Sequence, residues 1–340
     1  MAVLFSTHPA FAEHQPGAGH PERPERLQAV LAGVERSHLD STLVPVSPRA
    51  ATRDDLLRVH PAELVDALER FMAAGGGAID GDTAVSEGSW DAALMAAGAG
   101  LDAVERLDRG EGDAAFCAVR PPGHHATPTR AMGFCLFNNV AVTAAALADR
   151  GERVLIVDYD AHHGNGTQDV FWRDERVAYV SFHEYPLYPG TGALDEAGAG
   201  EGTGWTVNLA LPAGATGDVY RHAVELVVAP LAEEHGSTWL LLSAGFDAHR
   251  ADPLTGLGLT SGDMADLTLD LLQLAPPGRR LAFLEGGYDL EALADCTAAC
   301  LVALAGGRQA AEAPTSDGPG QHVPAAAAQV HHHAVESAKA

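Results

Sequence analysis

Residues 153–168 read RVLIVDYDAHHGNGTQ, and this stretch decides the fold. Its first part, 153–157, is a short apolar run rich in β-branched residues, which predicts a buried strand. Gly164 and Gly166 end the strand, and a helix can open over 167–172. Side chains able to bind metal or carry protons follow the strand at once: Asp158, Asp160, His162 and His163. Because open α/β sheets place their sites at the carboxyl ends of strands, the stretch predicts such a site here.

The strand geometry brings these polar groups together. Side chains of a strand alternate in direction, so Asp158 and Asp160 point the same way, and His162 falls where the chain leaves the strand. Buried polar groups cost folding free energy unless partners satisfy them. A divalent metal bound by Asp160 and His162 would satisfy them. A hydrogen-bonded Asp–His pair in a core turn is the alternative interpretation.

Strand-like runs alternate with helical patterns along most of the chain. This alternation predicts a mainly parallel sheet with helices on both faces, that is, a single three-layer α/β/α domain over residues 1–305. The expected strands are 3–6, 113–125 (ending in a rigid polar loop), 153–157, 177–182, 205–211, 239–245 and 281–287. Residues 20–37 are expected to be a proline-punctuated loop that runs into an amphipathic helix, and 75–90 is expected to be a loop. Further expected helices include 53–60, 62–72, 91–109, 139–149, 219–234 and 262–274.

The last part of the chain differs in composition. Residues 306–340 are rich in Ala, Pro, Gly and Ser without a periodic pattern, which predicts a disordered low-complexity tail. The three histidines at 331–333 lie in this tail, and we interpret them as incidental.

Charge and composition limit the partners. The chain has 340 residues, and its 46 acidic against 21 basic side chains give a formal charge of −25. This acid excess argues against nucleic acid, because few groups would neutralise phosphates. The acid excess would attract cationic ligands, but only weakly at cellular salt concentrations. A general contribution of the charge to solubility explains the excess equally well.

Targeting signals are not expected. Residues 1–11 lack the basic start of a signal peptide, and no apolar run approaches the roughly 20 residues of a membrane span. No cysteines form a CxxC pair, so neither a structural zinc site nor a disulfide framework is indicated. We expect a cytoplasmic protein with no membrane partner and with buried free thiols. The cysteines are Cys117, Cys135, Cys296 and Cys300.

Five loops that follow strands carry unusual chemistry: 120–125, 158–166, 181–192, 243–254 and 285–289. Asp160, His162 and Asp247 would give three protein ligands, and three ligands with an open position are typical of a catalytic divalent metal. Such a metal activates a water and polarises a carbonyl oxygen. Tyr288, which follows two glycines, offers a hydroxyl to a developing oxyanion. The set indicates hydrolysis of an amide or ester.

Six motifs in chain order resemble the histone deacetylase superfamily. They are RPPGHH (120–125), GFCLFNN (133–139), VDYDAHHGNGTQ (157–168), YPGTG (188–192), AGFDAH (244–249) with the following Asp-Pro, and EGGYD (285–289). HPERPERL (20–27) and Asn165 resemble most its class II branch and the related bacterial deacetylases and acetylpolyamine amidohydrolases. The resemblance covers about residues 3–305. It implies an arginase-like α/β fold and zinc-dependent hydrolysis of N-acetyl amines.

The resemblance also implies roles for single residues. Asp160, His162 and Asp247 would bind one zinc ion, with Fe²⁺ or another divalent ion as alternatives. His125 would be the general base and Tyr288 the oxyanion donor. A second set would support them: His124, hydrogen-bonded to Asp158, and Asn165, which stands beside His125 where class I members have an aspartate. An amide orients the ring but stabilises its cation less than a carboxylate would.

Further residues would contact substrate, product or a structural ion. Phe134 and Tyr188 would line the tunnel for the acylated side chain, and Gly133 would contact its alkyl part. Arg23 would lie near an internal channel through which acetate leaves. Asp82 is close to the expected rim, but its loop aligns poorly and receives no role. A structural potassium ion is implied at Asp158, Asp160, His162, Ser181 and Phe182. We interpret His163, His183 and His249 as structural histidines.

The substrate class is narrowed by Leu254. Polyamine-selective relatives carry a glutamate at the equivalent position after the third ligand, and a leucine there favours acetyl-lysine side chains over acetylpolyamines. A binuclear manganese ureohydrolase is disfavoured, because Gly164 stands where such a site needs a carboxylate. A module that binds acetyl groups without turnover is the remaining alternative, which an intact His125 and Tyr288 disfavour. The native substrate, acyl-chain preference, metal and oligomeric state stay open.

Overall fold

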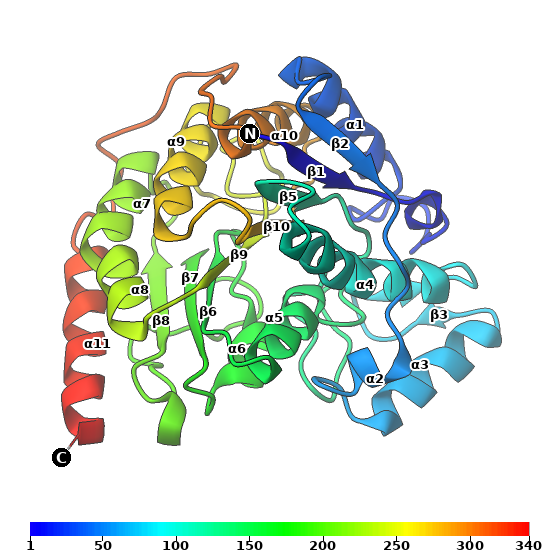
Figure 1. Cartoon of the computed structure of the whole chain (residues 1–340), viewed down its shortest axis with the longest axis horizontal. Helices are drawn as coiled ribbons and strands as arrows, with labels where there is room; N and C mark the ends of the chain where they lie inside the picture. The colour runs from blue at the N-terminus through cyan, green and yellow to red at the C-terminus, as the bar shows by residue number, and fades with distance from the viewer. Residues whose placement is uncertain (340) are drawn as a thin grey trace.

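The computed structural model describes residues 1–339, and its centre is an eight-stranded sheet in which neighbouring strands are parallel. The strands are β1 (Val3–Ser6), β2 (Leu43–Val46), β5 (Ala114–Cys117), β6 (Val154–Asp158), β7 (Val177–Glu184), β8 (Thr206–Leu211), β9 (Trp239–Ala244) and β10 (Arg280–Leu284). They lie in the order β2-β1-β5-β10-β9-β6-β7-β8. Helices cover both faces, so the predicted three-layer α/β/α domain is confirmed (Figure 1).

The helices form two groups that enclose the sheet (Figure 1). In the first group α4 and α5 pack together, and in the second α1 packs on α10, which also packs on α9. Glycines allow the closest approaches: a Cβ on Gly33 of α1 would lie 2.5 Å from a backbone oxygen of α10. The helices are α1 (Glu25–Ser37), α2 (Arg53–Leu56), α3 (Ala62–Ala73), α4 (Ser89–Asp108), α5 (Asn139–Asp149), α6 (Asn165–Phe171), α7 (Gly217–Ala223), α8 (Ala229–His235), α9 (Ser261–Leu271), α10 (Leu290–Leu304) and α11 (Val323–Lys339).

The central strands bring the functional loops to one edge of the sheet. β6, β9 and β10 are buried along their whole lengths, as expected for parallel strands covered on both faces. In register, Asp158 at the end of β6 lies opposite Ser181 of β7 and Ser243 of β9. The loops after β6 and β9 therefore begin side by side, whereas β7 continues to Glu184.

Two short strand features were not expected from the sequence. β2 contains Pro45, which weakens a strand pattern, but β2 is an edge strand, where a missing backbone N–H is tolerated. The predicted loop 75–90 contains a two-residue hairpin, β3 (Gly77–Ala78) with β4 (Ala84–Val85).

The predicted disordered tail differs from the structure. Helix α11 lies along the edge strand β8 and contacts α7 (Figure 1). Val323 and Ala327 are buried, and their spacing of four residues gives one apolar helical face. His331 also bonds through Nδ1 to the Gly204 carbonyl at 2.8 Å. An alanine-rich segment interpreted as low complexity thus covers an otherwise open sheet edge.

Within residues 1–339, none of the helices is both long and apolar enough to cross a membrane.

Candidate active site

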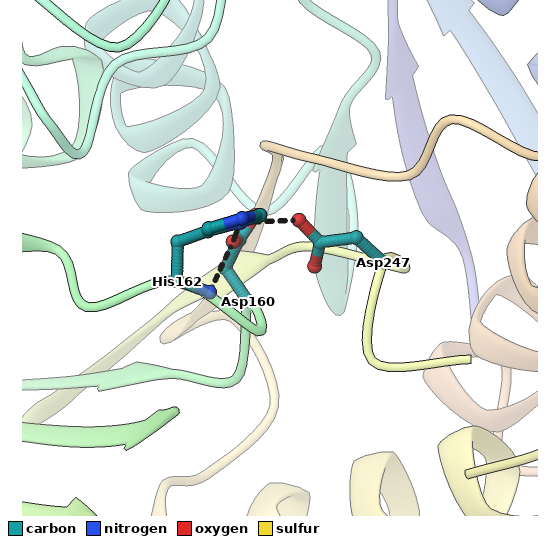
Figure 2. A group of neighbouring side chains, drawn as sticks. All are labelled: Asp160, His162 and Asp247. Carbon is teal, nitrogen blue, oxygen red and sulfur yellow. Dashed lines mark hydrogen bonds and ion pairs between the residues drawn. The ribbon is translucent and has the colours of Figure 1, made fainter. Parts of the chain in front are cut away.

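Three buried ligand-type side chains converge at the carboxyl edge of the sheet (Figure 2). Nδ1 of His162 lies 3.2 Å from Oδ1 of Asp160 and 3.0 Å from Oδ2 of Asp247. The second oxygen of each carboxylate is held by a backbone N–H: Gly286 donates to Asp160 at 2.7 Å and Ala161 donates to Asp247 at 2.8 Å. One nitrogen and two oxygens are thereby left facing one point.

The electrostatics of this group fit a divalent cation. Burial and the charge of Asp160 raise the pKa of Asp247 to about 7. Burial also raises the pKa of Asp160, but His124 and His162 outweigh it, and the net shift is downward. Two carboxylates this close compete for positive charge, which a divalent ion would supply. An N,O,O donor set suits zinc and similar divalent metals.

Two adjacent histidines from the 120–125 loop lie beside the ligands. Nδ1 of His124 lies 3.0 Å from Oδ2 of Asp158, and Nδ1 of His125 lies 2.8 Å from Oδ1 of Asn165. Burial alone would lower the pKa of His124, but the charges of Asp158 and Asp160 have the larger effect and raise this pKa to about 10. Burial and the charges of His124 and His162 hold the pKa of His125 well below its usual value. The pair therefore has one charged and one neutral ring near pH 7, and the neutral ring can accept a proton.

Glu285 supports this loop, and the sequence reasoning assigned it no role. Its Oε2 accepts hydrogen bonds from the backbone N–H of Gly123 at 2.7 Å and of His124 at 3.2 Å. Burial raises the pKa of this carboxyl to about 7. The signal was the glutamate inside the EGGYD motif, a charged residue directly after an apolar strand.

A cavity of about 230 Å³ opens from the surface to these groups. The four residues predicted to contact substrate all line this cavity. Asp82 and Leu187, to which the sequence assigns no role, line it as well. The complete lining of the cavity is Asp82, His125, Gly133, Phe134, His162, Leu187, Tyr188, Leu254 and Tyr288.

The backbone at Gly133 and Phe134 is shaped to form one wall of this cavity. A Cβ on Gly133 would lie 2.5 Å from Cδ2 of His125, so only glycine fits there. Phe134 has a φ of 68°, which is uncommon for a residue with a side chain and typical of functional sites. A hydrogen bond from its N–H to the hydroxyl of Thr83, 3.1 Å long, holds this conformation. The Phe134 ring meets the Tyr288 ring edge-on at 5.9 Å.

Two tyrosine side chains also line the cavity. The ring of Tyr188 lies 5.1 Å from that of His125 in an edge-on arrangement. The Tyr288 side chain is partly buried, and desolvation raises the pKa of its hydroxyl well above the usual value, so the group stays a proton donor. The guanidinium of Arg26 lies 5.0 Å from the centre of the Tyr288 ring.

Three arginines lie next to Glu22 in the sequence or in the folded chain, in different surroundings. The side chain of Arg23 is exposed, whereas Arg26 and Arg120 are buried and both bind Glu22. Helix α1 begins at Glu25, and Arg26 falls on its inward face. The buried cation beside Tyr288 is Arg26, for which no role is predicted from the sequence.

The remaining predicted histidines are engaged in local hydrogen bonds. His163 bonds to the hydroxyl of Thr191 at 2.8 Å and to Gln168 at 3.1 Å. His183 bonds to Ser181 at 2.9 Å and to the Gly192 carbonyl at 2.9 Å. Both rings use both nitrogens in this way, as structural histidines do.

The fold and this group of side chains define a hydrolase of the α/β class. The family model for the histone deacetylase domain matches residues 20–304. A probable deacetylase of Archaeoglobus fulgidus is 38% identical over 90% of this chain and 87% of its own length. A histone deacetylase-like amidohydrolase of Pseudomonas aeruginosa is 36% identical over 88% of this chain and 80% of its own.

A solved structure gives the same result. The crystal structure of the HDA15 HD domain superposes with a TM-score of 0.91 at 34% identity, and the match covers 99% of this chain and 96% of that one. The chain belongs to the histone deacetylase family and is a hydrolytic deacetylase.

Proposed function

We propose that this chain removes acetyl groups from lysine side chains by means of one divalent metal ion. Asp160, His162 and Asp247 would hold this ion, and zinc is the metal that we propose. The observation that carries the proposal is the convergence of these three ligand atoms beside His125 and Tyr288, which line one cavity together with His162. When bound, such an ion polarises the acyl carbonyl and acidifies a water molecule.

The residues of the chain perform the proton transfers. His125, neutral and oriented by Asn165, takes a proton from the attacking water as its oxygen adds to the acyl carbon. The same ring then gives that proton to the leaving amine as the C–N bond breaks. His124, held by Asp158, keeps a positive charge beside it. Tyr288 donates its hydroxyl hydrogen bond to the developing oxyanion.

Several features of the cavity support an acetyl-lysine substrate. Its walls are largely aromatic and aliphatic, which suits the alkyl stem of lysine. Leu254 is 38% exposed at the rim and presents no charge to a second ammonium group. Asp82, also in the lining, favours an acetylpolyamine as the second candidate, because its carboxylate would attract a distal cation.

Two further assignments belong to this proposal. The β6–β7 register sets Asp158 beside Ser181, which supports a structural potassium ion there. The four free buried cysteines suit a reducing compartment, so we assign the reaction to the cytoplasm.

The proposal is tested by acetate release from the purified, zinc-loaded protein. Acetyl-lysine peptides, acetylpolyamines and small acyl amides are compared by kcat/KM. We expect the highest value for an acetyl-lysine peptide. Stoichiometric zinc without acetate release from any of these compounds would indicate a binding module instead, and a preference for the polyamine would favour the second candidate.

A further inference from the structure

The chain beyond α10 returns across the molecule and lies against the start of α9. Thr315 donates to the Asp263 carboxylate through both its backbone N–H, at 2.9 Å, and its hydroxyl, at 2.7 Å. The hydroxyl of Thr260 donates to the Ala313 carbonyl at 2.8 Å. We call residues 308–318 the C-terminal strap. It is adjacent to the loop that joins β9 to α9 and carries Asp247.

Glu312 is the strap residue that reaches this loop. Its Oε2 lies 2.6 Å from Nε2 of His249, and its Oε1 accepts a hydrogen bond from Arg250 at 2.5 Å. Nδ1 of His249 accepts the N–H of Ala251 at 3.2 Å, so the ring donates from Nε2 to the carboxylate. The His249 side chain is only 6% exposed and that of Glu312 is 25% exposed, so the contact is partly shielded from solvent.

His249 is tied to the residues that follow it in the loop. The N–H of Asp252 donates to the His249 carbonyl at 2.8 Å, which closes a turn over residues 249–252. Arg250 pairs with Leu259 on the far side of the loop, its N–H donating to the Leu259 carbonyl at 2.8 Å. Holding the His249 ring therefore holds the turn.

Asp252, at the end of this turn, is bonded to two residues of the cavity. Its Oδ2 accepts the backbone N–H of Tyr288 at 2.7 Å, and its Oδ1 accepts the backbone N–H of Leu254 at 3.0 Å. The Asp252 side chain is buried. One carboxylate thus fixes the backbone of the tyrosine and of the rim leucine together.

We propose that Glu312 is a positioning residue for the deacetylase reaction. Through His249 it holds the turn 249–252, and through Asp252 this turn sets the positions of Tyr288 and Leu254. The inference rests on the proposed role of Tyr288. It gives the C-terminal strap a part in turnover beyond stabilising the fold.

The test compares two strap variants in the full-length, zinc-loaded protein. Glu312→Ala removes the contact with His249, and Arg308→Ala removes another strap contact, from Arg308 to Asp266 on α9, that does not involve the loop. We expect Glu312→Ala to lower kcat by roughly tenfold or more at full metal content, since small misplacements of reacting groups are costly. Arg308→Ala should keep the parent kcat. An equal kcat loss in both variants would overturn the proposal.

A double variant separates positioning from general stability. If Glu312 acts through Tyr288, adding Glu312→Ala to Tyr288→Phe should lower kcat by less than about twofold, because the affected interaction is already gone. A full further loss would overturn that route.

Hydrogen exchange provides a readout that does not depend on the proposed function. We expect faster amide exchange across residues 249–254 in Glu312→Ala and parent-like exchange there in Arg308→Ala. This result would show that Glu312 holds the turn 249–252, even if Tyr288→Phe proved fully active and the proposed role of Tyr288 were wrong. Unchanged amide exchange in Glu312→Ala would overturn the proposal that Glu312 holds this turn.

Discussion

Nδ1 of His125 is bonded at 2.8 Å to the side-chain oxygen of Asn165, so the proposed general base faces an amide rather than a carboxylate. The amide oxygen accepts a hydrogen bond from Nδ1–H, which leaves Nε2 unprotonated and able to take a proton from water. Because it carries no charge, it does not offset the burial and the neighbouring histidines that lower the pKa of His125.

Replacing this amide by a carboxylate should therefore change the pH dependence. In Asn165→Asp the negative charge favours the imidazolium form of His125 and raises its pKa. A base works in its unprotonated form, so the acid limb of the kcat/KM profile should move to higher pH. The profile is measured with one acetyl-lysine peptide on both proteins, with zinc content held equal. An acid limb that stays in place or moves to lower pH would contradict the role of His125.

Removing the hydroxyl of Tyr288 should affect turnover but not metal binding. Tyr288→Phe should lower kcat by roughly 10²–10³, the scale of losing one oxyanion donor. The ring remains to pack on Phe134, so the fold and the zinc content should match those of the parent. A loss below about threefold leaves no room for this role.

A charge at the cavity rim should shift substrate preference. In Leu254→Glu a carboxylate about 4 Å from a second substrate ammonium would contribute ~1 kcal/mol in water and ~4 kcal/mol at an effective dielectric near 20. The kcat/KM ratio of an acetylpolyamine to a neutral acetyl-lysine peptide should rise by about fivefold or more. An unchanged ratio would mean that other loop residues select the substrate.

A methyl group at Gly286 should disturb the ligands directly. A Cβ there would lie 2.3 Å from Oδ2 of Asp247 and 2.6 Å from Oδ2 of Asp160. Gly286→Ala should weaken zinc affinity by roughly 10–100-fold, the range seen when residues that support metal ligands are changed. Competition with a chelator measures this. Gly81→Ala is the matched control, since no atom lies within 4 Å of its Cβ position. Equal zinc affinity in the two variants would mean that the close approach of Gly286 to Asp160 and Asp247 does not matter for metal binding.

The sequence predicts the sheet well where strands are buried on both faces. The runs 154–157 and 239–244 are largely apolar, and each is followed within three residues by a carboxylate, so both the strand and the site at its end can be recognised. β2 was missed because Pro45 and exposed side chains give an edge strand no such pattern.

Contacts between distant segments account for the rest. Nothing near residue 312 in the sequence indicates that Glu312 binds His249, since the two are 63 residues apart and meet only in the folded chain. The same holds for Asp82, whose loop reaches the cavity by way of the β3–β4 hairpin. The inward position of Arg26 could not be predicted, because the residue at which α1 starts decides which side chains of the helix face the core.

Asp160, His162 and Asp247 are proposed to hold one catalytic divalent ion, and every step of the proposed reaction depends on it. The most direct test is the metal content of Asp247→Ala by elemental analysis, with the exposed Asp40→Ala as control. We expect the Asp247→Ala protein to be folded, with well under one metal ion per chain and negligible turnover, and the control to have full metal content. One tightly bound metal ion per chain in Asp247→Ala would overturn the ligand assignment.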